Sequence, residues 1–238
     1  MSALLSFLKE KDIPSEALGA LATFAPSASR RVRCEIAGHP NTPSEALPLL
    51  LDPQDSEICY LLASHPNTPP ETLIALANLP KVLLRVAKAL VTRPDIPSAA
   101  LYRLASDRRA DIRLAVANHP NADSECCMVL ARDPMKRIRR AIAIRTDIPT
   151  PLYSFLASDS ITMLDIAANP STPVHVIMEL AEKNNGSIDE RLATNPNTPE
   201  EVLRLIGERG SLWTKSRLLT NPHTPQDVRD ALAREKNS

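Results

Sequence analysis

Histidine, arginine and asparagine recur at one position of the chain, directly before a proline or, after Arg145, before a threonine. The column consists of His39, His65, Arg93, His119, Arg145, Asn169, Asn195 and Asn221. Three histidines in a column suggest a row of metal ligands. Zinc needs each ligand within about 2.1 Å, whereas positions one repeat apart lie about 9–10 Å from each other. Because all three residue types can hydrogen-bond carbonyl groups at helix ends, we expect a structural ladder and no metal site.

Charge is spread unevenly along the chain, although 28 Lys and Arg balance 28 Asp and Glu. Residues 81–145 contain 14 Lys and Arg against 6 Asp and Glu, a net charge of +8, while residues 1–80 and 146–238 each carry −4. A basic surface of this kind attracts carboxylates and phosphates. The residues that we expect to contact a partner are Lys88, Arg109, Arg113, Lys136, Arg139 and Arg140.

A second column alternates strictly in sign. It consists of Arg31, Glu57, Arg85, Asp111 and Arg137. Stacked repeats would place each of these charges beside an opposite one. We therefore expect a row of exposed ion pairs that favours the register of the repeats more than their stability.

Signatures of catalytic and cofactor sites are missing from the sequence. It has no phosphate-binding loop, no HExxH and no GxSxG, and it holds only five glycines. The four cysteines lie in apolar helical patterns without a CxxC pair, which favours reduced thiols. No stretch approaches the roughly 18 apolar residues of a membrane span. We expect a cytoplasmic protein that is not an enzyme, with no cofactor, metal, membrane or small-molecule substrate.

The elements that position these residues follow from a repeat of about 26 residues. Proline stands at positions 14, 43, 69, 97, 149, 173, 199 and 225, and Asp123 fills the matching place between 97 and 149. A second proline precedes most of these by three residues, as in HPNTPPETLIAL at 65–76 and NPNTPEEVLRL at 195–205. Such a period indicates a repeat architecture.

Each junction carries the pattern of a helix start. Thr68 is placed to be the N-cap, with Pro69 at the first helical position and Glu71 as the acid of a capping box. Thr42 and Thr198 begin equivalent motifs. Where isoleucine replaces the threonine, an aspartate precedes it, and we interpret this as a capping oxygen moved back by one residue. These aspartates are Asp12, Asp95 and Asp147.

Each repeat reads as two short antiparallel helices. After the junction, apolar residues recur three and four apart, as at Leu73, Leu76 and Ala77. A polar break follows, and then a second pattern such as Ile112, Val116 and Ala117. One such pair buries too little apolar surface to fold alone, so we expect the pairs to stack. Near the end of the stack, Trp213 is predicted to seal the C-terminal side of the core.

The junction, the Leu-Ala pair and a second helix such as DIRLAVANHP at 111–120 together resemble the leucine-rich repeat variant family over residues 10–235. The resemblance implies an all-α fold, a right-handed α-solenoid of about eight two-helix repeats related to HEAT and armadillo arrays, here as one domain over residues 1–238. It also implies an interaction module. The iron–sulfur domain that some members carry is not expected, because the cysteine cluster that precedes their repeats is missing here.

Second helices usually line the concave surface of arrays that this chain resembles. We therefore expect the basic residues of the central repeats to form a groove. The leading interpretation is a non-catalytic scaffold that binds an acidic protein partner there. The alternative is a nucleic-acid-binding repeat protein, and a third is a HEAT-like DNA glycosylase. Because the few aromatic residues are not interleaved with the basic ones, base stacking is not favoured.

Overall fold

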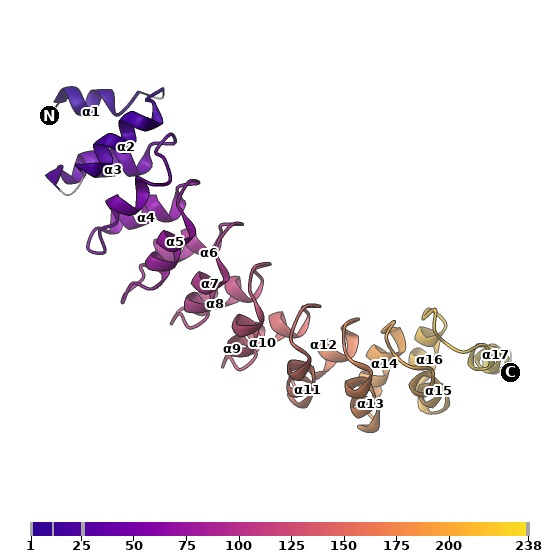
Figure 1. Cartoon of the computed structure of the whole chain (residues 1–238). Coiled ribbons are helices and arrows are strands. Elements are labelled where there is room, and N and C mark those ends of the chain that lie inside the picture. Colours follow the sequence, from indigo (N-terminus) through magenta and orange to yellow (C-terminus); the bar gives the residue numbers. More distant parts are fainter. Residues whose placement is uncertain (1, 11, 25–26, 237–238) are drawn as a thin grey trace. The chain divides into compact units, whose positions relative to one another are not determined.

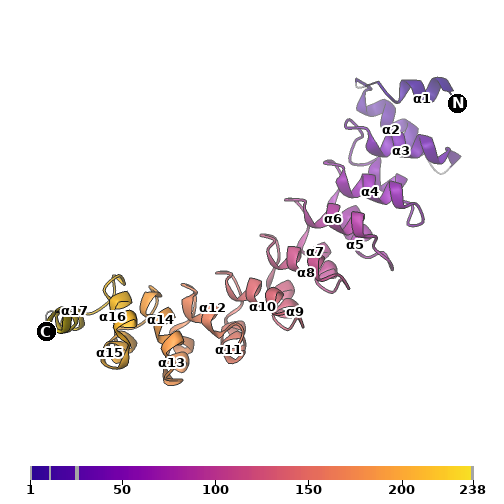
Figure 2. The ribbon, with the colours of Figure 1, turned by 180° about the vertical axis from the view of Figure 1, so that it is seen from behind.

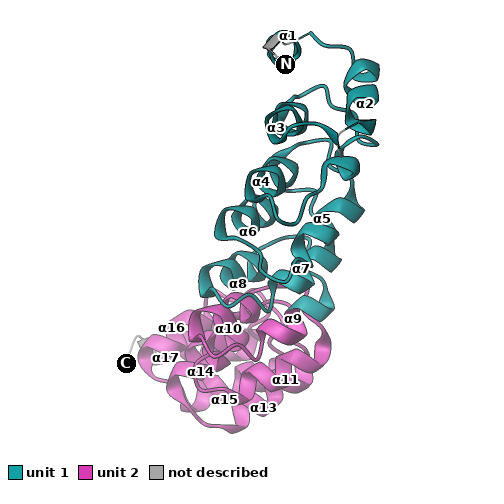
Figure 3. Cartoon of the chain, turned by 90° about the vertical axis from the view of Figure 1, so that its left-hand side faces the viewer, with its two compact units in different colours: residues 1–126 teal, residues 127–238 magenta. Residues whose placement is uncertain are grey.

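The computed structural model describes residues 2–10, 12–24 and 27–236, and these residues contain 17 short α-helices and no β-strand. The chain divides into two compact units, residues 1–126 and 127–238 (Figure 3). No helix among the described residues is long and apolar enough to cross a membrane. The all-α class is confirmed, whereas the assignment of one domain to the whole chain stays a prediction.

Unit 1 holds an N-terminal helix and four helix pairs, followed by the start of a further helix. In order, its elements are α1 (Ser2–Phe7), α2 (Ser15–Thr23), α3 (Arg30–Gly38), the 3₁₀ helix η2 (Leu47–Leu50), α4 (Ser56–Ser64), α5 (Pro70–Ala77), α6 (Leu84–Val91), α7 (Ser98–Leu104), α8 (Ala110–Ala117) and α9 (Ser124–Leu130), which crosses the boundary. In the second repeat, Pro48 falls inside the apolar pattern and has no backbone N–H to donate, so this segment forms only a 3₁₀ turn.

Unit 2 continues the same alternation of helices. Its further elements are α10 (Lys136–Ala143), α11 (Thr150–Ser158), α12 (Met163–Ala168), α13 (Val174–Glu182), α14 (Gly186–Thr194), α15 (Glu200–Arg209), α16 (Leu212–Leu218) and α17 (Gln226–Lys236). Figure 1 and the view from behind in Figure 2 show successive pairs following one another within each unit.

Each unit contains two layers of helices. In unit 1 the second helices α3, α4, α6 and α8 pack in sequence order, and the first helices α5 and α7 pack beside each other. In unit 2, α10, α12, α14 and α16 form the equivalent row, and α11 packs against α13. Pairs of helices packed in sequence order are consistent with a helical repeat.

The predicted apolar stripes form the core between these layers. Leu73 and Leu76 of α5 are at most 1% exposed, as are Ile112 and Val116 of α8. Complete burial of one such side chain stabilises a fold by roughly 1.5–3 kcal/mol. The period of three and four residues therefore identified the buried face of both helix types correctly.

The capping prediction is wrong by one residue. The N-cap of α5 is Pro69, not Thr68, and the helix starts at Pro70 without a side-chain cap. The N-cap of α15 is likewise Pro199. Thr68 is buried, and its hydroxyl donates to the carbonyl of Leu62, six residues earlier, at 2.6 Å. The threonine thus ends the preceding helix, and no capping box forms at these junctions.

This threonine bond recurs in both units. Equivalent bonds of 2.6–2.7 Å join Thr42 to Ile36, Thr172 to Ile166, Thr198 to Leu192, and Thr224 to Leu218. Each of these carbonyls also accepts the backbone N–H three residues later, so the threonine hydroxyl adds a second hydrogen bond at the end of the helix.

Two of the aspartates that precede isoleucine, Asp95 and Asp147, have a different role from the predicted one. Asp95 forms a two-bond ion pair with Arg93, with N···O distances of 2.9 and 2.7 Å. Asp147 pairs with Arg145 in the same way, at the same two distances. Hydrogen bonds from Arg93 lower the pKa of Asp95 below its ordinary value. Asp95 and Asp147 therefore pair with an arginine of the ladder column, and the helices that follow them have proline at the N-cap and no side-chain cap.

Trp213 does not seal the core. Its side chain lies on α16 and is 59% exposed, with the Arg217 guanidinium 4.9 Å from the ring centroid. The indole N–H donates to Glu190 at 2.9 Å. At the C-terminal end of unit 2, the mostly buried side chains of α17 are Val228 and Leu232.

Candidate partner-binding surface

The ladder column of unit 1 hydrogen-bonds one repeat to the next. Nε2 of His39 bonds the carbonyl of Glu10 at 2.8 Å, and Nε2 of His65 bonds the carbonyl of His39 at 2.8 Å. Arg93 continues the series to the carbonyl of His65 at 2.6 Å, and His119 continues it to Arg93 at 2.9 Å. The predicted ladder is confirmed within this unit.

The histidine tautomer follows from the second ring nitrogen. In His39, His65 and His119, Nδ1 accepts a hydrogen bond from the backbone N–H two residues later, at 3.0–3.2 Å. An accepting Nδ1 leaves the ring proton on Nε2, where it can be donated to the carbonyl. Both ring nitrogens are therefore hydrogen-bonded to backbone groups, and neither presents a free lone pair to a metal ion.

Unit 2 builds the same ladder with asparagine. Nδ2 of Asn169 donates to the carbonyl of Arg145 at 2.7 Å, Asn195 donates to Asn169 at 2.9 Å, and Asn221 donates to Asn195 at 3.0 Å. Each asparagine Oδ1 accepts the N–H two residues later, at 2.9–3.0 Å. Asparagine thus makes both bonds of the histidine without a titratable ring.

Two of the three predicted contact residues in unit 1 are engaged within the protein. Arg109 donates to the carboxylate of Asp107 from Nε at 2.7 Å and to the carbonyl of Val82. Arg113 donates to the carbonyl of Asp107 at 2.7 Å. Burial of the Asp107 carboxyl opposes ionisation, but the hydrogen bonds from Arg109 outweigh it and lower the pKa. These arginines hold the loop between α7 and α8.

Two of the predicted residues in unit 2 are held in the same manner. Arg139 donates to Asp159 at 2.7 Å and to the carbonyl of Asp133 at 2.9 Å. Arg140 forms a two-bond ion pair with Asp165, at 2.7 and 3.0 Å. Arg113 and Arg139 occupy one repeat position, as predicted, and each bonds the carbonyl six residues before it.

The lysines among the six predicted residues differ from the arginines. Lys88 on α6 and Lys136 on α10 are exposed. Among the described residues, no carboxylate lies within ion-pair distance of either ammonium group. Of the predicted set, these two side chains are the ones with charges still available to a partner.

Arg85 and Glu57 of the alternating row form an expected ion pair in unit 1. Arg85 donates to Glu57 at 2.8 Å and also to the carbonyl of Ser56. The ion pair that joins α3 to α4 is instead Arg30 with Asp55, at 2.6 and 2.9 Å. Asp55 also accepts the N–H groups of the first turn of α4, so this carboxylate caps the helix and links two repeats.

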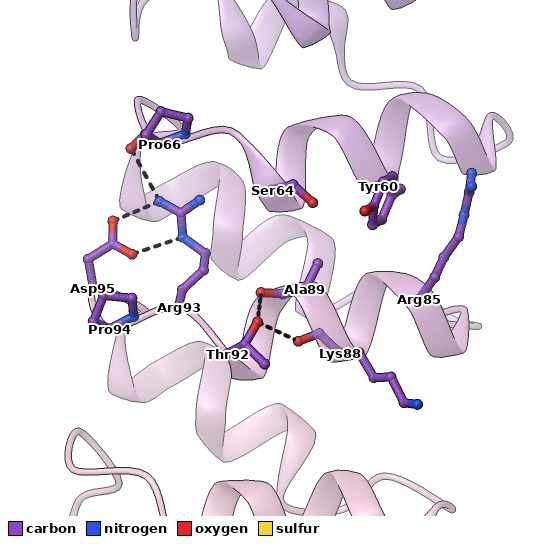
Figure 4. A pocket seen from close by; sticks show the side chains of 10 residues that line it. All are labelled: Tyr60, Ser64, Pro66, Arg85, Lys88, Ala89, Thr92, Arg93, Pro94 and Asp95. Carbon is purple, nitrogen blue, oxygen red and sulfur yellow. Dashed lines mark hydrogen bonds and ion pairs between the residues drawn. The ribbon is translucent and has the colours of Figure 1, made fainter. Parts of the chain in front are cut away.

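A hollow of about 720 Å³ lies between α4 and α6 in unit 1. Its lining is Tyr60, Ser64, Pro66, Arg85, Lys88, Ala89, Thr92, Arg93, Pro94 and Asp95 (Figure 4). Lys88 is the one member of the predicted contact set in this lining. Sequence reasoning missed Tyr60 and Ser64, although Tyr60 occupies the repeat position of Lys88, and Ser64 that of Thr92.

Three cations border the hollow, and two of them are already satisfied. The Arg93 donors reach the carbonyls of Ala63, His65 and Pro66 and both oxygens of Asp95, which uses all five N–H groups. Arg85 pairs with Glu57, and its guanidinium lies 4.9 Å from the ring centroid of Tyr60. The lining therefore presents one uncommitted positive charge, that of Lys88.

Comparisons of this chain with protein-family models, with curated proteins and with solved structures found no match.

Proposed function

We propose that this chain is a non-catalytic scaffold that binds an acidic protein partner through basic side chains of its second helices. The hollow between α4 and α6 carries the proposal, because it places an exposed, unpaired Lys88 beside a concave surface. A volume of about 720 Å³ falls in the range typical of ligand sites. In unit 2, Lys136 is likewise exposed, and we propose it as a contact of that unit for an acidic segment.

As part of the same proposal, each unit is a segment of a right-handed solenoid of the leucine-rich repeat variant type. The support is the recurrence of two-helix repeats, of the threonine bond and of the ladder bond at spacings near 26 residues. Four free cysteines support a reducing compartment, and we place the protein in the cytoplasm.

Nucleic acid is the second candidate, favoured by the net charge of +8 in residues 81–145. The contacts of the basic residues weigh against it, because Arg109, Arg139 and Arg140 pair with carboxylates of the protein. Aromatic faces are occupied as well, since Arg85 stacks on Tyr60 and Arg132 stacks on Phe155. A DNA glycosylase, the third interpretation, would need such a face for a flipped base.

Binding of the full chain to poly-L-glutamate and to a random-sequence DNA duplex tests the proposal. We expect poly-L-glutamate to bind and the double variant Lys88→Glu, Lys136→Glu to bind about tenfold more weakly, because exposed ion pairs are worth about 0.2–1 kcal/mol each and reversal adds repulsion. Reversing Arg113 or Arg139 would also break loop contacts, so the lysines give the cleaner test.

The matched control is Lys81→Glu with Lys183→Glu, which makes the same charge change at exposed lysines outside the hollow. Equal weakening by both double variants would contradict a defined site. Binding to the duplex but not to poly-L-glutamate, with an affinity that falls steeply with salt, would replace the proposal by the nucleic-acid alternative.

A further inference from the structure

The hollow in unit 1 is elongated along two parallel helices. Figure 4 shows Pro66, Pro94, Arg93 and Asp95 at one end and Tyr60 with Arg85 at the other. The flanking helices α4 and α6 have nine and eight residues. A helix rises about 1.5 Å per residue, so the lining on α6, from Arg85 to Thr92, covers about 10 Å, and it continues past the helix end to Asp95. Extended chain advances about 3.3 Å per residue, and about four residues would span that length.

Small apolar residues line the middle of the hollow and one of its ends. Ala89 lies on α6, while Pro66 and Pro94 follow the ends of α4 and α6. The Thr92 hydroxyl already donates to the carbonyls of Lys88 and Ala89, at 3.0 and 3.1 Å. These groups favour small apolar side chains in an occupant.

Only one charged side chain of the lining, Lys88, is not paired within the described part of the protein. The Arg93–Asp95 end is neutral, and every N–H of Arg93 is bonded within the protein. Arg85 is paired with Glu57 and stacked on Tyr60. Lys88 lies on the same helix as Arg85 and is exposed. A single carboxylate satisfies such a site, whereas a polyanion would leave most of its charges without a partner.

Hydroxyl groups of α4 add hydrogen-bonding capacity to the hollow. Tyr60 and Ser64 both line it, one turn apart on the helix. Neither hydroxyl forms a hydrogen bond to another residue in the part of the chain that the structure describes. Both are therefore free to bond main-chain carbonyl or amide groups, which an extended segment presents along its length and a compact anion does not.

We infer that the hollow between α4 and α6 binds an extended peptide segment of about four residues, with one carboxylate at Lys88 and small apolar side chains toward Pro66 and Pro94. This inference rests on the proposed function and specifies which kind of segment of an acidic protein the hollow recognises. The carboxylate contacts Lys88 because the Arg93–Asp95 end is already neutral. The hydroxyls of Tyr60 and Ser64 bond the main chain of the segment.

The test uses the ¹⁵N-labelled full chain and two blocked tetrapeptides, Glu-Ala-Ala-Leu and Gln-Ala-Ala-Leu, each N-acetylated and C-amidated. We expect the Glu peptide to shift the amides of Tyr60, Ser64 and Ala89 and to bind at least about fivefold more tightly than the Gln peptide, because a hydrogen bond to a charged group outweighs a neutral one. Lys88→Met should remove this preference, and Lys81→Met should retain it. The spectrum itself verifies that each variant is folded.

Several results would overturn the inference. These are equal affinity for the two peptides, shifts confined to residues outside the hollow, or a preference that survives in Lys88→Met. Salt gives an independent criterion, because a single ion pair with a short peptide is only weakly screened by added salt, whereas binding of a polyanion weakens steeply as log salt rises. Binding of poly-L-glutamate without the tetrapeptide preference would leave the scaffold intact and refute the inference, and loss of both would refute both.

Discussion

Replacement of His65 by asparagine should remove an acid sensitivity from unit 1 while retaining the bonds of the ladder. His65 is 5% exposed, its Nε2 bonds the carbonyl of His39 at 2.8 Å, and its Nδ1 accepts the N–H of Asn67 at 3.1 Å. Asn195 makes the same two bonds in unit 2, at 2.9 Å each. An asparagine at position 65 can therefore form the same two hydrogen bonds that Asn195 forms in unit 2.

The sign of the effect follows from the pKa of His65, which burial lowers below its ordinary value. The Arg93 guanidinium and the His39 ring, which face it from the ends of α6 and α3, lower it further, and the bond to the His39 carbonyl opposes them. The unfolded chain binds a proton near pH 6.5, and the folded chain binds it only at lower pH. The contribution of His65 to the free energy of unfolding is fully present above pH 6.5. Below pH 6.5 this free energy falls by up to about 1.4 kcal/mol per pH unit, until the pKa of His65 in the folded chain is reached.

Urea unfolding at pH 7.5, 6.5 and 5.5, followed by circular dichroism and by amide exchange of α4, measures this difference. We expect wild type to lose about 1 kcal/mol more than His65→Asn between pH 7.5 and 5.5. The reciprocal variant Asn195→His should gain acid sensitivity in unit 2. Parallel pH profiles for wild type and His65→Asn would refute the reasoning, as would an imidazole of folded His65 that titrates at pH 6.5 or above.

Three further substitutions test the contacts of the fold, each by urea unfolding at pH 7. Thr68→Val should lower the free energy of unfolding by about 1 kcal/mol because it removes the shorter of two hydrogen bonds to the Leu62 carbonyl and leaves only the 3.4 Å bond from the His65 N–H, and Thr68→Ser should recover most of that; an unchanged midpoint would exclude this role. Arg209→Met should lower the free energy of unfolding by about 3 kcal/mol because the Asp189 side chain, 3% exposed, loses the arginine that donates two hydrogen bonds to it. A decrease below about 1 kcal/mol would contradict this role of Arg209. Trp213→Ala should change stability by less than about 0.5 kcal/mol, since the side chain is 59% exposed; a large loss would restore a core role for Trp213.

The helix pairs and the ladder could be predicted because their signals are local. Leucine spacing fixes the buried face of each helix, and a column of side chains that share one hydrogen-bonding ability identifies the ladder. The junction was more ambiguous, because the Thr68 hydroxyl can accept an N–H from the next helix or donate to the end of the previous one. Proline at the N-cap position decides in favour of the second arrangement.

The surface was harder to predict because its contacts join residues far apart in sequence. The acids that engage Arg139 and Arg140 lie 20 and 25 residues away, so a count of charges along the chain overestimates the basic surface. The hollow likewise combines side chains of α4 with those of α6, 28 residues apart. Only the packing of consecutive repeats identifies Lys88 as the available cation among them.

Recognition of an acidic partner by this surface can be followed through the lysine side-chain signals of the ¹³C,¹⁵N-labelled full chain during titration with poly-L-glutamate at physiological salt. We expect the Lys88 ammonium signal to shift and saturate, while the signals of Lys81 and Lys183 stay in place. Equal shifts at all lysines, or a Lys88 signal that does not respond while the polymer binds, would contradict the claim that this surface recognises an acidic partner.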